Sequence, residues 1–164
     1  MSQLVLSWGK CTIYTKKSGQ TYWSKEPIPV EDSTQLTPTA QDAREAPVEG
    51  GELEARQAKS NKYELVYQLR AAASRSENIT HVDGVVADEY AVAVVPEDAT
   101  AKGIIIDRAA VNVLDNQFNS NAGIVDEYHF VGLKPTTGNI VKRGVIEVTE
   151  DSQHSGQYTV EFDD

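Results

Sequence analysis

Residues 63–70 read Tyr-Glu-Leu-Val-Tyr-Gln-Leu-Arg, and this stretch indicates the fold class. Bulky apolar residues occupy every second position, and most positions between them are polar. A period of two is typical of a β-strand with one face in a core, because successive side chains of a strand point to opposite faces. The pattern predicts a strand over 63–70 with Tyr63, Leu65, Tyr67 and Leu69 on its inner face.

The same periodicity continues along most of the chain. Further strands are predicted where β-branched and aromatic residues gather, and turn residues such as Asp83-Gly84 and Ser155-Gly156 separate them. Many short strands with such punctuation favour a mainly β fold, an antiparallel β-sandwich or barrel. Two stretches rich in Ala, Glu and Arg, 52–59 and 70–76, leave room for one short helix. The other predicted strands are 6–13, with a β-bulge at Gly9-Lys10, and 90–95, 103–114, 128–131, 145–149 and 158–162.

One internal segment has a different composition. No aromatic residue lies between Trp23 and Tyr63, and four of the six prolines fall in this interval, beside Gly50-Gly51. Proline removes a backbone donor and fixes φ, so the segment cannot be a continuous helix or a central strand. We expect a single domain over 1–164 with a long loop or arm at 24–62. Its apolar residues are the candidate contacts with another subunit: Ile28, Val30, Leu36, Val48 and Leu53.

The overall charge excludes some classes of partner. The chain has 164 residues and a formal net charge of −10. Binding to nucleic acid or to an anionic membrane surface depends on clustered Lys and Arg, which this composition does not favour. With 40% hydrophobic residues the chain is too apolar for general disorder. The composition therefore indicates a folded, acidic protein that does not hold DNA tightly.

The charge is unevenly distributed along the chain. Residues 1–25 contain four lysines and no acid, which leaves −14 for the remainder. After Arg143 there is no Lys or Arg, whereas acids accumulate. Three interpretations stay open: two solvated surfaces, neighbouring strands that neutralise each other, or complementary surfaces on different subunits.

The amino-terminal residues do not read as a targeting segment. A secretory signal places positive charge before an apolar run of 7–15 residues, whereas here Lys10 follows only a short apolar stretch. The longest aliphatic runs are far shorter than the roughly 20 residues that span a bilayer. We expect a protein made in a cytoplasm, without a membrane partner.

No pattern for catalysis or metal binding stands out. The three histidines are His81, His129 and His154, and the spacing of His81 and Asp83 supplies only two of the three or four ligands that zinc needs. Cys11 lies in a predicted strand and is expected to be a packed side chain. Phosphate-binding loops and nucleophile elbows are absent from the sequence. We expect no enzyme, no cofactor and no metal.

The order of features resembles the tail tube (major tail) proteins of long-tailed bacteriophages. The resemblance covers most of the chain and lies in its layout and short phrases. It begins with Trp8-Gly9-Lys10, continues through the Pro- and Gly-rich segment into Asn61–Leu65, and ends with Tyr128-His129-Phe130-Val131-Gly132-Leu133-Lys134-Pro135 before a β-rich tail. Between them come Asp83–Val86, Tyr90–Val95 with Pro96-Glu97, and Gly103–Leu114.

This resemblance implies a β-sandwich or small barrel, often with one helix, that forms hexameric rings stacked into the conduit for phage DNA. It implies a homo-oligomer that contacts other tail proteins and lies in the virion tail after synthesis in the bacterial host cytoplasm. DNA passes through without being bound specifically, and an acidic lumen would repel phosphate. Long arms in this family reach a neighbouring subunit or ring, and 24–62 is the corresponding candidate.

Two other functions remain open from the sequence. A β-sandwich that binds carbohydrate or peptide would use exposed aromatic residues, with Trp23 and Tyr63 as candidates. A hydrolase with a carboxylate pair is a weaker alternative, because such a pair is brought together only by folding.

Overall fold

The structure is a computed structural model that describes residues 10–163 except 32, 72, 73, 76, 99 and 120–122. It is an all-β protein, and the described residues contain no helix, so the short helix that the sequence allowed is not found. The strands, all paired antiparallel, are β1 Cys11–Lys17, β2 Trp23–Lys25, β3 Gln35–Thr39, β4 Arg44–Pro47, β5 Leu53–Gln57, β6 Lys62–Arg70, β7 Tyr90–Pro96, β8 Gly103–Asn119, β9 Gly123–Gly132, β10 Val141–Glu150 and β11 Gln157–Asp163.

The predicted strands are confirmed within these bounds, except that residues 6–9 of the first one lie outside the described residues. Residues 63–70 lie in β6, where Leu65, Tyr67 and Leu69 are buried as expected, and 52–59 contains strand β5. The phrase Trp8-Gly9, which opens the resemblance, lies outside the described residues.

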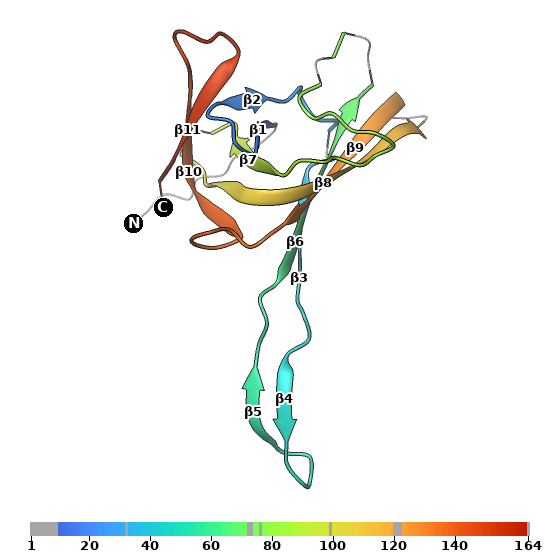
Figure 1. Ribbon diagram of the computed structural model, residues 1–164, viewed down its shortest axis with the longest axis vertical. Coiled ribbons are helices and arrows are strands. Elements are labelled where there is room, and N and C mark those ends of the chain that lie inside the picture. The colour runs from blue at the N-terminus through green and yellow to red at the C-terminus, as the bar shows by residue number, and fades with distance from the viewer. Residues whose placement is uncertain are drawn as a thin grey trace.

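A closed barrel forms the body of the molecule. The pairing order β10-β11-β2-β1-β7-β8 returns to its start because β10 also pairs with β8, through Val141–Gly144 and Gly103–Ile106. Figure 1 shows this body. A closed sheet leaves these strands without the free edges at which open sheets aggregate.

Strand β8 extends beyond the barrel. Its first residues pair with β7 and β10, while Ala109–Asn119 pairs with β9, which in turn pairs with β6 and then β3. The nine strands therefore form one sheet that is closed at one end and carries an extension, β9-β6-β3, at the other. The hairpin β4–β5 forms a separate two-stranded sheet beyond the extension (Figure 1).

Two hydrophobic cores lie on opposite faces of the shared strands. The barrel core includes Trp23 and Ile146, and the second core is built around Tyr67, whose ring stacks 5.3 Å from Tyr128 and 5.5 Å from Phe130 between centroids. Strict alternation on β1, β7 and β8 sends neighbours to different cores, as in a sandwich. The barrel-facing residues are Tyr14, Ala93 and Ile105, and those facing the second core are Ile13, Val92 and Ile106.

Glycines occupy the point where the barrel closes. Gly103 on β8 and Gly144 on β10 are cross-strand partners, and both are buried. A Cβ at Gly103 would lie 2.5 Å from the Val94 carbonyl oxygen, and one at Gly144 would lie 2.3 Å from the Asp163 carbonyl oxygen. Backbone atoms cannot move aside as a flexible side chain can, so closure at this point requires residues without a Cβ.

We predict that Gly144→Ala destabilises the barrel by about 2 kcal/mol or more, as overpacking of a tight interior does. Denaturant unfolding followed by tryptophan fluorescence measures this effect, because Trp23 lies in the barrel core. The exposed Glu147→Ala on the same strand is the control and is expected to change stability by about 0.5 kcal/mol at most. Equal stabilities of the two variants would contradict the closure argument.

Candidate assembly site

A long β-hairpin arm projects from the body. We define the arm as residues 35–66: β3 and β6 form its base, with Gln35 opposite Val66 and Thr39 opposite Lys62, and β4 and β5 form its outer part. Figure 1 shows the arm pointing directly away from the barrel. Every residue from 44 to 62 is exposed, so the outer part buries no side chain against the rest of its own chain.

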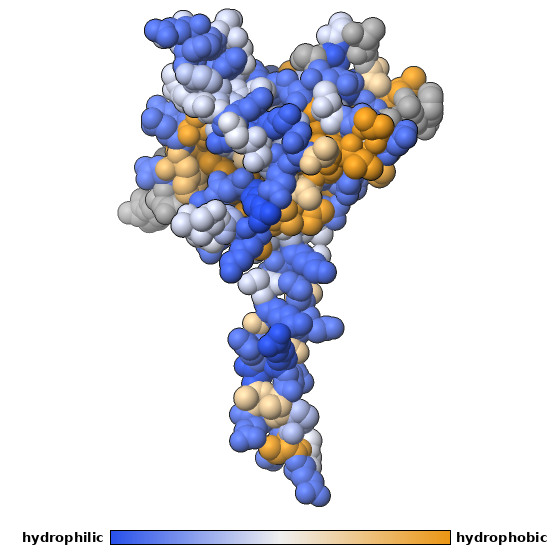
Figure 2. Space-filling model, in the orientation of Figure 1, coloured by the Kyte–Doolittle hydropathy of each residue, from blue (hydrophilic) through white to orange (hydrophobic). Residues whose placement is uncertain are grey.

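The end of the arm has an unusual chemical character. A glycine turn at Gly50-Gly51 (φ +98° and +90°) joins β4 to β5, and the Val48 N–H donates to the Glu52 carbonyl at 2.8 Å. Val48 and Leu53 are 41% and 48% exposed beside this turn. Figure 2 shows the corresponding hydrophobic area near the end of an otherwise hydrophilic arm. We define the tip as residues 46–55, which carry three acids and no base: Glu49, Glu52 and Glu54.

An isolated two-stranded hairpin is at best marginally stable in water, and three or more strands or a packed face are needed for independent stability. The outer arm has neither. Its only described ion pair, between Arg56 and Glu45 at 3.5 Å, is exposed and contributes about 1 kcal/mol at most. The outer arm therefore leaves Val48 and Leu53 exposed at its tip with no packed face of its own chain to cover them.

The five predicted contact residues separate into three places. Val48 and Leu53 lie at the tip, whereas Leu36 lies on β3 and packs against the second core. Ile28 and Val30 lie on the body, in the segment between β2 and β3, where the Val30 N–H donates to the Gln68 carbonyl at 2.8 Å. The projecting arm therefore begins later in the chain than the predicted segment 24–62, because residues 24–34 cover the body.

Ile28 forms a ridge between two surface hollows. Ile28 is 68% exposed, an unusually large fraction for an aliphatic residue. On one side it borders a hollow of about 490 Å³ together with Lys25, Arg70 and Arg75. On the other it borders a hollow of about 510 Å³ with Lys10 and Val30. We call Lys10, Lys25, Ile28, Val30 and Arg70 the Ile28 surface.

A buried carboxylate anchors the segment behind this surface. Glu26 is 4% exposed, and its Oε1 accepts a hydrogen bond from the Thr15 hydroxyl of β1 at 2.8 Å. The Glu26 N–H also donates to the Ile13 carbonyl at 2.8 Å. Burial raises the pKa of Glu26 above its ordinary 4.5, while the hydrogen bonds and the nearby Arg75 oppose that shift. Glu26 therefore holds the start of the segment against β1.

A raised carboxyl pKa means that the folded protein binds a proton more readily than the unfolded chain does. The contribution of Glu26 to stability is then fully present below pH 4.5, its ordinary pKa, and is lost as the pH rises through the folded pKa. We predict that the melting temperature of Glu26→Gln, relative to the wild type, increases between pH 4.5 and pH 8. Thermal unfolding by circular dichroism across this range checks the difference. A difference that is independent of pH would contradict the prediction.

A second buried pair fastens the 71–89 segment to β9. Arg75 Nη2 donates to Asp126 Oδ2 at 2.7 Å and to the Tyr128 hydroxyl at 3.3 Å. The side chains of Arg75 and Asp126 are 6% and 10% exposed. Burial, partly opposed by Arg75, raises the pKa of Tyr128 to about 12. The Arg75 guanidinium thus provides a hydrogen-bond donor and a positive charge to Asp126 and Tyr128, two polar side chains of β9.

We predict that Arg75→Ala lowers the free energy of unfolding by about 3 kcal/mol, because removing one member of a buried ion pair leaves the other charge uncompensated. Arg75 also contacts Glu77, which is 53% exposed. Glu77→Ala removes this exposed contact alone and is expected to cost about 1 kcal/mol at most. Urea unfolding of both variants measures the effects, and similar losses would show that the Asp126 contact has no special weight.

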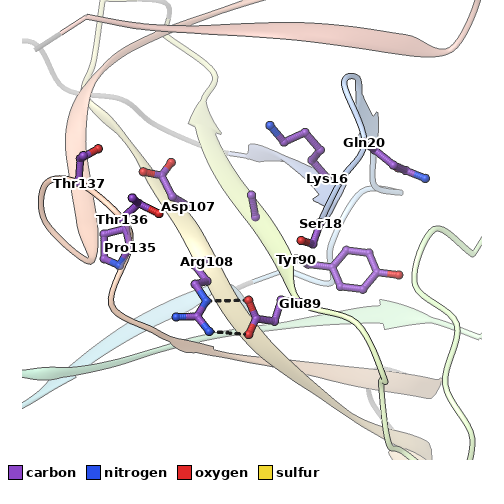
Figure 3. Close-up of a pocket in the computed structure, with 12 residues that line it drawn as sticks. Lys16, Ser18, Gln20, Glu89, Tyr90, Asp107, Arg108, Pro135, Thr136 and Thr137 are labelled. Carbon is purple, nitrogen blue, oxygen red and sulfur yellow. Dashed lines mark hydrogen bonds and ion pairs between the residues drawn. The ribbon is translucent and has the colours of Figure 1, made fainter.

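A polar pocket lies where β7 and β8 meet the 133–140 loop (Figure 3). Its four charged lining residues already have partners. Arg108 donates from Nε and Nη2 to both carboxylate oxygens of Glu89, at 2.7 and 2.8 Å. Asp107 pairs with Lys142, and Lys16 lies 5.1 Å above the Trp23 ring. A charged ligand would have to break one of these contacts, so the pocket is better explained as a structural joint.

The histidines have local structural partners. His81 Nδ1 accepts from the Gly84 N–H at 3.2 Å, within the turn where Asp83 has φ +50°. His129 lies between two carboxylates, with Nδ1 2.5 Å from Glu64 and Nε2 2.6 Å from Glu127. Across the described residues, no cluster of three or more His, Cys, Asp and Glu side chains is arranged to hold a metal ion.

The two aromatic residues that were candidates for ligand stacking lie in different environments. Trp23 is 7% exposed in the barrel core, so it offers no open platform. Tyr63, on β6, is partly buried. Tyr63 lines a surface hollow of about 570 Å³ with Lys134 and Asn139, so burial removes only Trp23 as a stacking candidate.

The lysine-bearing and acid-rich segments meet in the barrel. Strand β2 pairs with β11 through Trp23–Tyr158 and Ser24–Gln157. The paired residues are uncharged, so this contact brings the two segments together without pairing their charges. Lys17, however, forms its ion pair with Asp88 of the β6–β7 connection, at 3.1 Å.

Three parts of this site were not singled out from the sequence. Glu26 and Arg75 are ordinary charged residues in the chain, and only folding buries them. The run of acids at the tip was visible in the sequence, since residues 46–55 contain no base, but nothing there indicated that it ends a projecting hairpin.

No protein-family model matches the chain, and no curated protein has a significantly similar sequence. Within the ranges that the structure describes, no helix is both long enough and apolar enough to cross a membrane.

Proposed function

We propose that this protein is a structural subunit of a phage or prophage tail, most simply a tail tube protein, and that it has no catalytic role. The observation that carries the proposal is the arm. A hairpin that buries nothing in its own chain, and that ends in exposed Val48 and Leu53, gains its stability from a neighbouring subunit.

The rest of the molecule is compatible with repeated assembly. The closed barrel provides a rigid body, and the arm reaches out from it as the resemblance to tail tube proteins implies. Copies joined arm-to-body use two different surfaces, and such head-to-tail contacts generate rings when the rotation closes. The net charge of −10 suits a conduit through which DNA slides, because carboxylates repel phosphate. In this proposal the protein is made in the bacterial cytoplasm and ends in the virion tail.

Assembly by the arm is tested with substitutions at its tip. We predict that concentrated wild-type protein forms rings or tubes, and that Val48→Asp combined with Leu53→Asp weakens assembly by about 10- to 100-fold through lost apolar burial and added repulsion. Light scattering against concentration and negative-stain electron microscopy measure this. The matched control, Gln57→Asp with Ser60→Asp, adds two charges to the same arm away from the tip and is expected to assemble normally.

A second variant removes the outer part of the arm and keeps its base, β3 and β6, on the body. Thr39 and Lys62 are cross-strand partners, so an Asn-Gly turn can replace residues 40–61. This variant should unfold at nearly the wild-type temperature and remain monomeric. Compact wild-type monomers at every concentration and salt, also in the presence of other tail proteins, would overturn the proposed function.

A further inference from the structure

The tip and the Ile28 surface are complementary in charge and in apolar character. The tip presents Val48 and Leu53 among acids that have no base beside them in residues 46–55. The Ile28 surface presents one strongly exposed aliphatic side chain among cations. Opposite potentials around matching apolar centres favour one docking register and speed encounter.

The charges around Ile28 are predominantly positive. Lys10, Lys25 and Arg70 are exposed at the two hollows, and Glu31 is the exposed acid among the lining residues. The other carboxylate, Glu26, is 4% exposed and turned to Thr15, so it offers little surface to an incoming segment. An incoming acidic segment therefore meets more positive than negative charge.

A single chain cannot make this contact with itself. The arm leaves the body at Thr39, and the nine residues from there to Val48 carry the tip about 30 Å outward when extended. Ile28 lies on the body, before β3, whereas the arm points away from the body (Figure 1). The occupant of the Ile28 surface must come from another molecule.

Another exposed apolar patch fits the tip less well. Val82 and Val85 are 77% and 66% exposed in a turn held against Val113 of β8, whose neighbour Leu114 is 51% exposed. The turn contains the exposed acid Asp83, and Leu114 pairs across the sheet with Glu127. An acidic tip would meet negative charge at this patch, whereas it meets mainly positive charge at the Ile28 surface.

We propose that the Ile28 surface is the docking site for the arm tip of a second copy of this chain, with Leu53 and Val48 packing against Ile28 and the tip acids facing Lys25, Arg70 and Lys10. The proposal rests on the assembly role proposed above and adds the receiving surface. The tip spans ten residues, fewer than the roughly 20–30 a side of a stable interface. One contact is therefore weak, and repetition around a ring strengthens it.

Cysteine pairing between two variants tests the contact directly. Both carry Cys11→Ser, because Cys11 lines one of the hollows. Leu53→Cys protein is mixed with Ile28→Cys protein and oxidised mildly, and the mixed dimer is measured by non-reducing electrophoresis. Docked thiols have an effective concentration in the millimolar range, so this dimer should form at least about tenfold faster than in a mixture of Leu53→Cys with Val82→Cys. Equal rates, or faster pairing at Val82, would overturn the proposal.

Charge exchange tests the same contact without cysteines. Lys25→Glu and Glu52→Lys should each weaken assembly severalfold, and mixing the two reversed proteins should restore one contact of matching charge. Additive losses without any restoration in the mixture would overturn the proposal. Melting temperatures identify variants that fail to fold, and the exposed Glu54→Lys then replaces Glu52→Lys.

The outcomes separate this proposal from the proposed function. Tubes that persist in Ile28→Asp and Lys25→Glu variants would leave the tube role standing and reject the docking surface. A specific mixed dimer at Ile28 without rings or tubes under any condition would support the docking surface and reject the tube role.

Discussion

The whole fold depends on one strand, β8, which belongs to two structures at once. Its first residues close the barrel between β7 and β10, and its continuation supports β9 and, through β9, the base of the arm. Alternating residues such as Ile105 and Ile106 contribute to different cores. Because one continuous strand joins barrel and extension, the base of the arm, β3 and β6, belongs to the same sheet as the body, whereas the outer hairpin β4–β5 forms a sheet of its own.

Most of the strands were predictable from the sequence, because local alternation fixes which residues face a core. Leu65, Tyr67 and Leu69 are buried as their spacing predicted, and the strand breaks at Asp83-Gly84 and Ser155-Gly156 fall between strands. The closure of the barrel was not predictable. The pairing of Gly103 with Gly144 joins residues far apart in the chain, and two glycines by themselves carry no signal of partnership.

The sequence predicted which segment contains the candidate site, but it did not predict how the residues of that segment are arranged in space. Composition indicated that 24–62 differs from the rest, since prolines and glycines interrupt regular pairing across the core. It did not separate the body-bound residues Ile28 and Val30 from the projecting Val48 and Leu53, because all four are apolar residues in a polar context. That separation depends on the β3–β6 pairing, which places Thr39 opposite Lys62 and sends the intervening chain outward. In the proposed assembly the two groups become the two sides of one contact.

The pairing of β2 with β11 has a consequence for biosynthesis. Residues 23–25 emerge early from the ribosome, yet their partners at 157–158 emerge near the end of the chain. Contacts of such large sequence separation pay a high loop-closure cost and form late in folding. During translation β2 waits for β11 and β8 waits for β10, while β3–β6 are already available as local hairpins. The local pairings within the arm, β3 with β6 and β4 with β5, therefore become available to the nascent chain before the pairings that close the barrel.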